Sequence, residues 1–87
     1  MPYIDKDQRC RLDPHIDSLL DRWYHMTKLD VAGEFTYVIY RLLKLFSGRY
    51  WMRALGLGCM LCAMLEMYRR DHAVYEDEKI KENGDVY

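Results

Sequence analysis

The sequence predicts an all-α protein, a three-helix antiparallel bundle with a short N-terminal helical turn and an extended C-terminal tail. Apolar residues recur every three or four positions along three stretches of the chain, which is the spacing of one helix face. No alternating strand pattern is longer than a few residues. With 87 residues the chain has the size of one small domain, so residues 1–87 are expected to form a single helical domain.

The first helix is expected to begin at Asp13-Pro14 and to run over about residues 14–28. Asp is a favourable N-cap, and Pro suits the first helical position because its missing N–H has no helical partner there. Apolar residues then repeat at helical spacing. A separate short helical turn, capped by Asp5, is expected before it, over about residues 5–12.

A connection near residues 29–33, with Asp30 as the expected cap, leads to a second helix over about residues 31–47. Gly48 follows this helix directly. A glycine suits that position because the residue that ends a helix often adopts a left-handed conformation.

The last helix is expected to be the longest, from about Tyr50 to the Asn-Gly pair at 83–84, followed by a short tail. Residues 54–65 carry no charge and are apolar on most faces, so a buried core helix is expected there. This run is too short to span a bilayer, and no membrane association is expected. Gly56 and Gly58 lower the helix propensity, which indicates tight packing or a kink.

The chain is also expected to form a homo-oligomer. A chain this short buries only about 60–65% of its unfolded surface, so a lone monomer is marginal. Yet 51% of its residues are apolar. Ala54, Gly58 and Cys62 place small side chains in one row of the long helix, which lets another helix come close.

The net charge of −1 is unevenly distributed along the chain. Residues 35–70 hold six basic side chains and one acidic, whereas both ends are acidic. The overall balance does not suggest binding to long nucleic acid. The basic middle instead suits a small anion, above all where copies of the chain converge.

No catalytic, metal or cofactor set can be assigned. Cys59 and Cys62 form a C-x-x-C pair within a helix, so we expect these two to be buried core thiols, and all three cysteines, Cys10 included, to be reduced thiols of a cytosolic protein. Zinc binding needs two further ligands at suitable spacing, and a redox site is the weakest alternative. The three histidines are scattered singly, and no phosphate-binding glycine loop is present. The protein is therefore not expected to be an enzyme.

Tyr37, Arg41 and Lys44 form the first candidate binding surface, because their spacing places them on one helix face. Tyr40 and Lys44 form a second pair four residues apart. An arginine offers a two-pronged donor to phosphate, and a tyrosine ring can stack on a base. The alternative is a solvated face whose long side chains cover the core.

Arg49 and Arg53 form the second candidate, on either side of two aromatic residues at the start of the last helix. Free N–H groups at a helix start also attract anions. The alternative is that Trp51 anchors the core while the arginines stay at its rim.

Arg69 and Arg70 form the third candidate, although Arg70 is also expected to pair with Glu66 four residues earlier. The candidate ligand-binding residues are therefore Tyr37, Tyr40, Arg41, Lys44, Arg49, Arg53, Arg69 and Arg70.

Four segments resemble an uncharacterised family of short phage and bacterial proteins, classed as a domain of unknown function. They are the start MPYI, the segment LDPHID at 12–17, Tyr68-Arg69-Arg70, and the block YEDEKIKENGDVY at 75–87. Residues 71–74 depart from the family pattern, which ends there in Ala-Pro. The resemblance implies no activity, but it implies an ordered, functional tail and a phage context.

The chain is also similar, at the level of class, to small helical phage sponge proteins, which sequester cyclic nucleotide messengers of bacterial immunity. The similarity lies in size, helical pattern and aromatic and basic content. We therefore expect a non-enzymatic oligomer that sequesters a nucleotide-type anion in the cytoplasm of an infected bacterium. The alternative is a protein–protein interaction module that inhibits or caps a host or virion protein, for which the Met-rich helix and acidic tail are the evidence.

Overall fold

A computed structural model describes residues 2–86, and every regular element in this range is helical, which confirms the all-α prediction. The elements are α1 (Lys6–Trp23), α2 (Lys28–Leu43), the 3-10 turn η1 (Lys44–Phe46), α3 (Tyr50–Met67), the π-turn η2 (Tyr68–His72) and α4 (Ala73–Asn83). The chain thus forms three helical stretches, namely α1, α2 and a third that η2 divides into α3 and α4. Tyr87, the last residue of the expected tail, lies outside the described residues.

The predicted cap at Asp5 is confirmed, but α1 continues from it through Pro14, so the prediction of a separate turn that ends near residue 12 and of a helix start at Asp13-Pro14 is wrong. The Asp5 carboxylate accepts a hydrogen bond from the backbone N–H of Gln8 at 2.8 Å, and the Gln8 side chain accepts one from the backbone N–H of Asp5 at 3.2 Å. This capping box starts the helix early. Pro14 has no backbone N–H, so the hydrogen bond to the carbonyl of Cys10 is absent. The helix nevertheless continues on both sides of the proline.

α2 also begins earlier than expected, because Thr27 caps it. The Thr27 hydroxyl accepts a hydrogen bond from the backbone N–H of Asp30 at 3.3 Å, so residues 29–33 are helical rather than a connection. Asp30 lies in the first turn, where a negative charge suits the helix dipole. The glycine stops are confirmed: Gly48 after η1 and Gly84 after α4 have φ of 108° and 82°.

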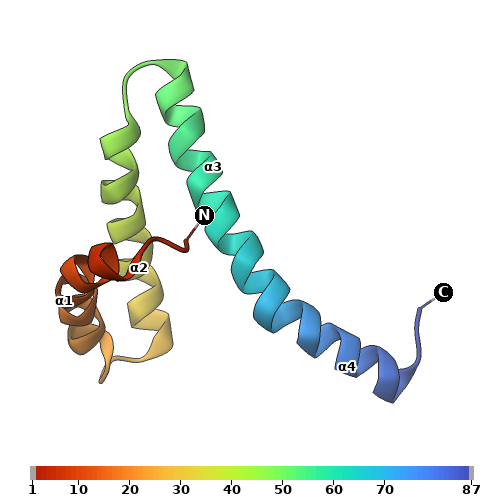
Figure 1. Ribbon diagram of the computed structural model, residues 1–87. Helices are drawn as coiled ribbons and strands as arrows, with labels where there is room; N and C mark the ends of the chain where they lie inside the picture. The colour runs from red at the N-terminus through yellow and green to blue at the C-terminus, as the bar shows by residue number, and fades with distance from the viewer. Residues whose placement is uncertain (1, 87) are drawn as a thin grey trace.

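α2 and α3 lie side by side and antiparallel, joined at a tip formed by residues 47–49 (Figure 1). α1 lies across the other end of α2, and α4 continues from α3 away from the other helices (Figure 1). The η1 turn that follows α2 packs tightly on α3 at Gly56, where an added Cβ would lie 2.8 Å from the Cβ of Phe46. The tight packing that the glycine predicted is confirmed at this position.

A small cluster of polar and aromatic side chains connects α1 to α2. The carboxylate of Glu34 accepts hydrogen bonds from Arg22 at 2.8 and 3.1 Å and from the indole N–H of Trp23 at 2.9 Å. These hydrogen bonds lower the pKa of Glu34, and the bonds from Arg22 contribute more than the one from Trp23. The Trp23 ring meets Phe35 edge-on, with 6.1 Å between ring centroids.

Among residues 2–86 no hydrophobic side chain is buried, and the one buried residue is Gly56. The predicted buried core helix over residues 54–65 and the predicted buried thiols are therefore wrong for a single chain, in which Cys10, Cys59 and Cys62 are all exposed. The reason is geometric, because α3 packs against α2 on one side and its other sides are open. The radius of gyration is 16.8 Å, against about 12 Å for a compact domain of this length.

Within the described part of the chain, no helix combines the length and the hydrophobicity that crossing a membrane requires.

Candidate functional site

A hollow of about 360 Å³ lies between the C-terminal end of α2 and the N-terminal half of α3. We call it the tip pocket. Its walls are Tyr40, Leu43, Lys44, Phe46, Ser47, Arg53 and Leu57. Its size falls within the range of about 300–1,000 Å³ that small-molecule sites occupy. It combines a mostly apolar wall with a few convergent polar groups, which is the usual composition of such sites.

The tip pocket brings together three of the predicted ligand-binding residues, Tyr40 and Lys44 from the α2 side and Arg53 from α3. The Lys44 ammonium lies 5.1 Å from the centroid of the Tyr40 ring, which is a cation–π contact. Neither Lys44 nor Arg53 forms an ion pair with a carboxylate in the described range. Since the sequence holds no acidic residue between Glu34 and Glu66, the local field at the tip is positive.

Two further predicted residues form a pair on α2. Arg41 donates a hydrogen bond from Nη1 to the Tyr37 hydroxyl at 3.1 Å, and its guanidinium lies 5.8 Å from the centroid of that ring. Tyr37 and Tyr40 are 60% and 62% exposed, so both rings remain accessible to a ligand from solvent. This geometry also fits the alternative of a solvated face.

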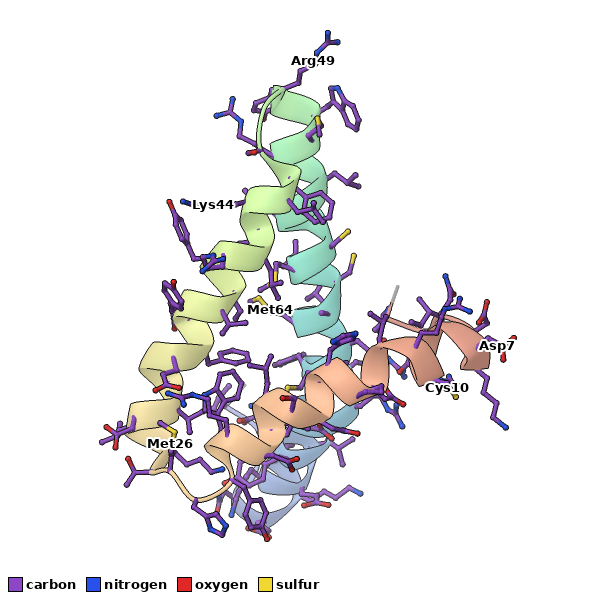
Figure 2. The ribbon with its side chains drawn as sticks, turned by 90° about the vertical axis from the view of Figure 1, so that its left-hand side faces the viewer. Asp7, Cys10, Met26, Lys44, Arg49 and Met64 are labelled. Carbon is purple, nitrogen blue, oxygen red and sulfur yellow. The ribbon has the colours of Figure 1, made fainter. Side chains whose placement is uncertain are left out.

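Arg49 lies at the tip and points away from the body of the molecule, whereas Lys44 lies farther down on the side of the hairpin (Figure 2). Arg49 is the N-cap residue of α3, and its side chain makes no capping hydrogen bond. It adds positive charge above the tip pocket without forming part of the pocket wall.

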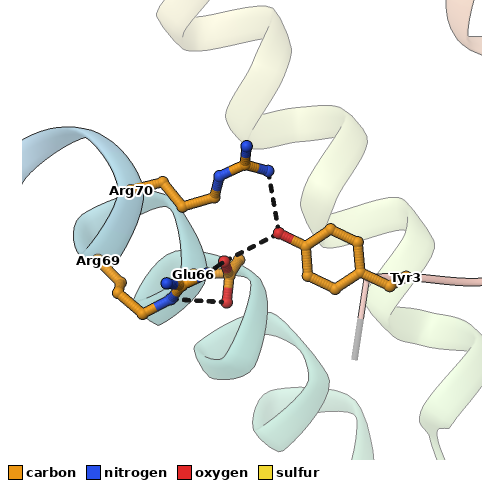
Figure 3. A network of polar contacts seen from close by, with 4 residues as sticks. All are labelled: Tyr3, Glu66, Arg69 and Arg70. Carbon is orange, nitrogen blue, oxygen red and sulfur yellow. Dashed lines mark hydrogen bonds and ion pairs between the residues drawn. The ribbon is translucent and has the colours of Figure 1, made fainter.

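Arg69 and Arg70 lie at the opposite end of α3 and belong to a different network (Figure 3). Tyr3, from the N-terminal segment, donates a hydrogen bond to Oε1 of Glu66 at 2.9 Å and accepts one from Nη1 of Arg70 at 3.1 Å. Arg69 forms the ion pair with Glu66. The expected pairing of Glu66 with Arg70 is therefore wrong, because Tyr3 inserts between the two side chains.

The network changes the acidity of its members. The hydrogen bonds from Arg69 and then from Tyr3 lower the pKa of Glu66, and the charges of Arg69 and Arg70 add to this effect. Conversely, Glu66 raises the pKa of Arg69. Since Glu66 already neutralises part of the positive charge here, Arg69 and Arg70 are less suited than the tip residues to bind a ligand phosphate within one chain.

Sequence reasoning missed the role of Tyr3, which was noted only as part of a segment that resembles the family. It also missed the apolar walls of the tip pocket, Leu43, Phe46 and Leu57. One signal was present in the sequence. The cost of Gly56 within a helix indicated a close neighbour, and that neighbour is Phe46.

The histidine and cysteine side chains of the described residues form no cluster of metal ligands. Within residues 2–86 no group of three or more His, Cys, Asp or Glu side chains is placed to hold a metal ion. His72 stacks on Tyr68, with 6.2 Å between ring centroids and 4° between ring planes.

Comparison with known proteins gives one family match. The family model "Domain of unknown function (DUF6899)" matches residues 1–86. No curated protein and no solved structure matches the chain.

Proposed function

The chain belongs to this family of domains of unknown function, and we propose, from the properties of its own surface, that it is a non-enzymatic, homo-oligomeric protein that sequesters a nucleotide-type anion. The observation that carries the proposal is the meeting of Tyr40, Lys44 and Arg53 around the tip pocket. The tyrosine ring and the apolar wall suit a base, and the two cations suit phosphate. Tyr37, Arg41 and Arg49 extend the same basic and aromatic surface.

The ligand class that fits best is a cyclic nucleotide, held intact as a phage anti-defence sponge would hold an immune messenger in the cytoplasm of an infected bacterium. A cyclic nucleotide carries a base and a phosphate, and the pocket wall offers an aromatic ring, apolar side chains and two cations. The support is the class-level similarity in size, helical content and aromatic and basic composition.

The homo-oligomeric part of the proposal is supported by exposed surface. The chain exposes 8226 Å², whereas a compact monomer of its mass exposes about 5,400 Å². Apolar side chains on every helix contribute to this excess. We propose that the closed helical bundle predicted from the sequence forms between copies of the chain rather than within one.

Two measurements test the ligand. Mass spectrometry identifies small molecules released by heat from protein purified out of infected cells, and calorimetry measures binding to a panel of cyclic mono-, di- and trinucleotides. We expect one of them to bind with a Kd at or below about 1 μM and to be recovered unchanged. If no member of the panel binds at that level, the sponge proposal is wrong. Recovery of a cleaved product would instead indicate an enzyme.

A second candidate function is a protein–protein module that inhibits or caps a host or virion protein. It is favoured by a hollow of about 390 Å³ on α3 and η2, whose walls include the flexible side chains of Met64 and Met67, and by the acidic α4 beyond it. A stoichiometric protein partner in a pull-down, from a preparation that carries no nucleotide, would favour this function over the first.

A further inference from the structure

The two mid-helix glycines of α3 lie in opposite environments. Gly56 faces α2, and an added Cβ there would lie 2.8 Å from the Phe46 side chain. Gly58 lies about 160° around the helix axis from Gly56, and an added Cβ there would have nothing within 4 Å. Packing within one chain therefore explains why position 56 is a glycine. It does not explain the glycine at position 58, which weakens the helix.

Gly58 lies at the centre of an apolar surface that nothing in the described chain covers. We call this surface the far face of α3, and its residues are Trp51, Ala54, Gly58, Leu61, Cys62 and Leu65. Its large members are half exposed or more, Trp51 at 60%, Leu61 at 52% and Leu65 at 56%. The sequence carries no charge between Arg53 and Glu66. A solvated helix face normally carries charged side chains, so this face is typical of an interface.

The exposed area indicates what kind of partner covers the far face. The chain exposes 8226 Å², which is about 2,800 Å² more than a compact monomer of this mass. Two copies together would have an excess of about 5,600 Å², at the upper end of the total area of about 2,000–5,000 Å² or more that obligate subunit interfaces bury, and more than a transient contact needs. A second copy of the chain is the partner that is always present at equal concentration.

We propose that α3 pairs with α3 of a second copy, antiparallel and about a two-fold axis at Gly58. The small residues Ala54, Gly58 and Cys62 are symmetric about Gly58, so this axis sets each chain's Ala54 against the partner's Cys62. The two backbones then approach closely along the whole row. This inference rests on the homo-oligomeric part of the proposed function and is independent of its ligand.

Charge favours the antiparallel order over the parallel one. Parallel helices would set the two copies of Arg49 and Arg53 beside one another, with no carboxylate between Glu34 and Glu66 to separate them. Antiparallel helices set the basic N-terminal half of each α3 beside the C-terminal end of its partner, where Glu66 and Asp71 offset Arg69 and Arg70. The like charges of the two N-terminal halves are thereby separated.

Matched glycine substitutions test the surface. Light scattering on the full chain should show that Gly58→Leu weakens self-association at least tenfold. Gly33→Leu is the control, because Gly33 lies on α2 with nothing within 4 Å of an added Cβ and away from the far face. Circular dichroism confirms that both variants remain helical. Equal self-association of the two variants would overturn the proposal.

Disulfide trapping tests the orientation, and it does not require a variant that disrupts the interface. In a Cys10→Ser, Cys59→Ser background, Cys62 alone should form no dimer under mild thiol oxidation, whereas Cys62 with Ala54→Cys should. Ala54→Cys in a chain with Cys62→Ser should not, because about 12 Å along the axis would separate the two thiols. A dimer through Cys62 alone indicates parallel pairing and overturns the proposal. The proposal is equally overturned if the thiol introduced by Ala54→Cys forms no disulfide with Cys62 of the second copy.

Calorimetry with cyclic nucleotides on the same proteins keeps the two proposals apart. A chain that pairs through the far face and binds no nucleotide supports the interface and contradicts the ligand. A chain that binds nucleotide with its full affinity as a Gly58→Leu monomer supports the ligand and contradicts a site that depends on pairing.

Discussion

Lys44 and Arg53 reach the tip pocket from the two sides of the hairpin, so each can be removed without displacing the other. A charge-assisted hydrogen bond contributes about 1.5–3 kcal/mol. We therefore expect Lys44→Ala or Arg53→Ala to weaken binding of the cyclic nucleotide about 10- to 150-fold, measured by calorimetry.

Lys28→Ala is the matched control, because Lys28 carries the same charge at the opposite end of α2. It should change the affinity only by the small amount that a distant charge contributes. Equal losses for Lys28→Ala and Lys44→Ala would show that general positive charge, rather than the tip pocket, attracts the ligand.

Gly56 carries a second prediction at the scale of one residue. Gly56→Ala places a methyl group 2.8 Å from the Phe46 side chain. The overpacking costs about 1–3 kcal/mol, and the gain in helix propensity returns only about 1 kcal/mol. We expect a net destabilisation of up to about 2 kcal/mol, measured as a lower urea midpoint.

Gly33→Ala should raise the urea midpoint, because no atom lies close to the new methyl group. The free energy of unfolding should rise by about 0.5–1 kcal/mol. A stabilising effect at both glycines would mean that α2 and α3 are not held together at Phe46.

The sequence was sufficient to predict the chemistry of single residues and insufficient to predict which of them meet. Tyr40 and Lys44 could be paired because they share a helix. Arg53 joins them only through the hairpin turn, and no local pattern predicts that contact. Tyr3 reaches Glu66 across most of the chain length, so its role depends on tertiary structure alone.

The N-terminal segment acts as a latch on the end of α3, through the hydrogen bonds of Tyr3 with Glu66 and Arg70. The hydrogen bonds from Arg69 and then from Tyr3 lower the pKa of Glu66, so the stabilising effect of this network is fully present above the ordinary pKa of a glutamate. It is lost as the pH falls through the lowered pKa of Glu66 in the folded protein. The latch is therefore expected to hold at neutral pH and to open in acid.

Tyr3→Phe tests this latch by removing one hydrogen-bond donor to Glu66. The pKa of Glu66 should rise towards its ordinary value and stay somewhat below it, since Arg69 still donates to the carboxylate. A carboxyl NMR titration measures the shift. Tyr24→Phe is the control, because Tyr24 lies against His25 and away from Glu66. An unchanged Glu66 titration in the Tyr3 variant would mean that the latch is not formed in solution.

At the scale of elements, the ends of helices were predictable where glycine sets them and misplaced where caps compete. Gly48 and Gly84 both adopt positive φ, as a helix stop requires. Asp13-Pro14 has the composition of a helix start, yet the capping box at Asp5 begins the helix first and the helix tolerates the proline. A cap signal indicates where a helix can begin, and competition with neighbouring caps decides where it does.

At the scale of the molecule, the apolar composition that predicted a buried core is distributed over open helix faces. Among residues 2–86 the single chain buries no hydrophobic side chain. Secondary structure follows from local spacing and was predictable, whereas burial depends on how the helices pack together, which local spacing does not give. Propensity and periodicity describe one helix at a time and do not show how many of its sides are covered, which is why the burial of residues 54–65 and of the thiols was misplaced.

Stability that depends on other copies must depend on concentration, and this is the prediction for the whole molecule. If folding is coupled to pairing, mass action adds about 1.4 kcal/mol of stability per dimer for each tenfold rise in protein concentration. For a dimer of this size that corresponds to a rise in Tm of about 3–6 °C per tenfold. Calorimetry or circular dichroism over about 5 to 500 μM measures it. The Gly58→Leu variant should unfold at a lower temperature with little dependence on concentration. A wild-type Tm that stays constant over this range would mean that one chain is stable with its far face exposed to water.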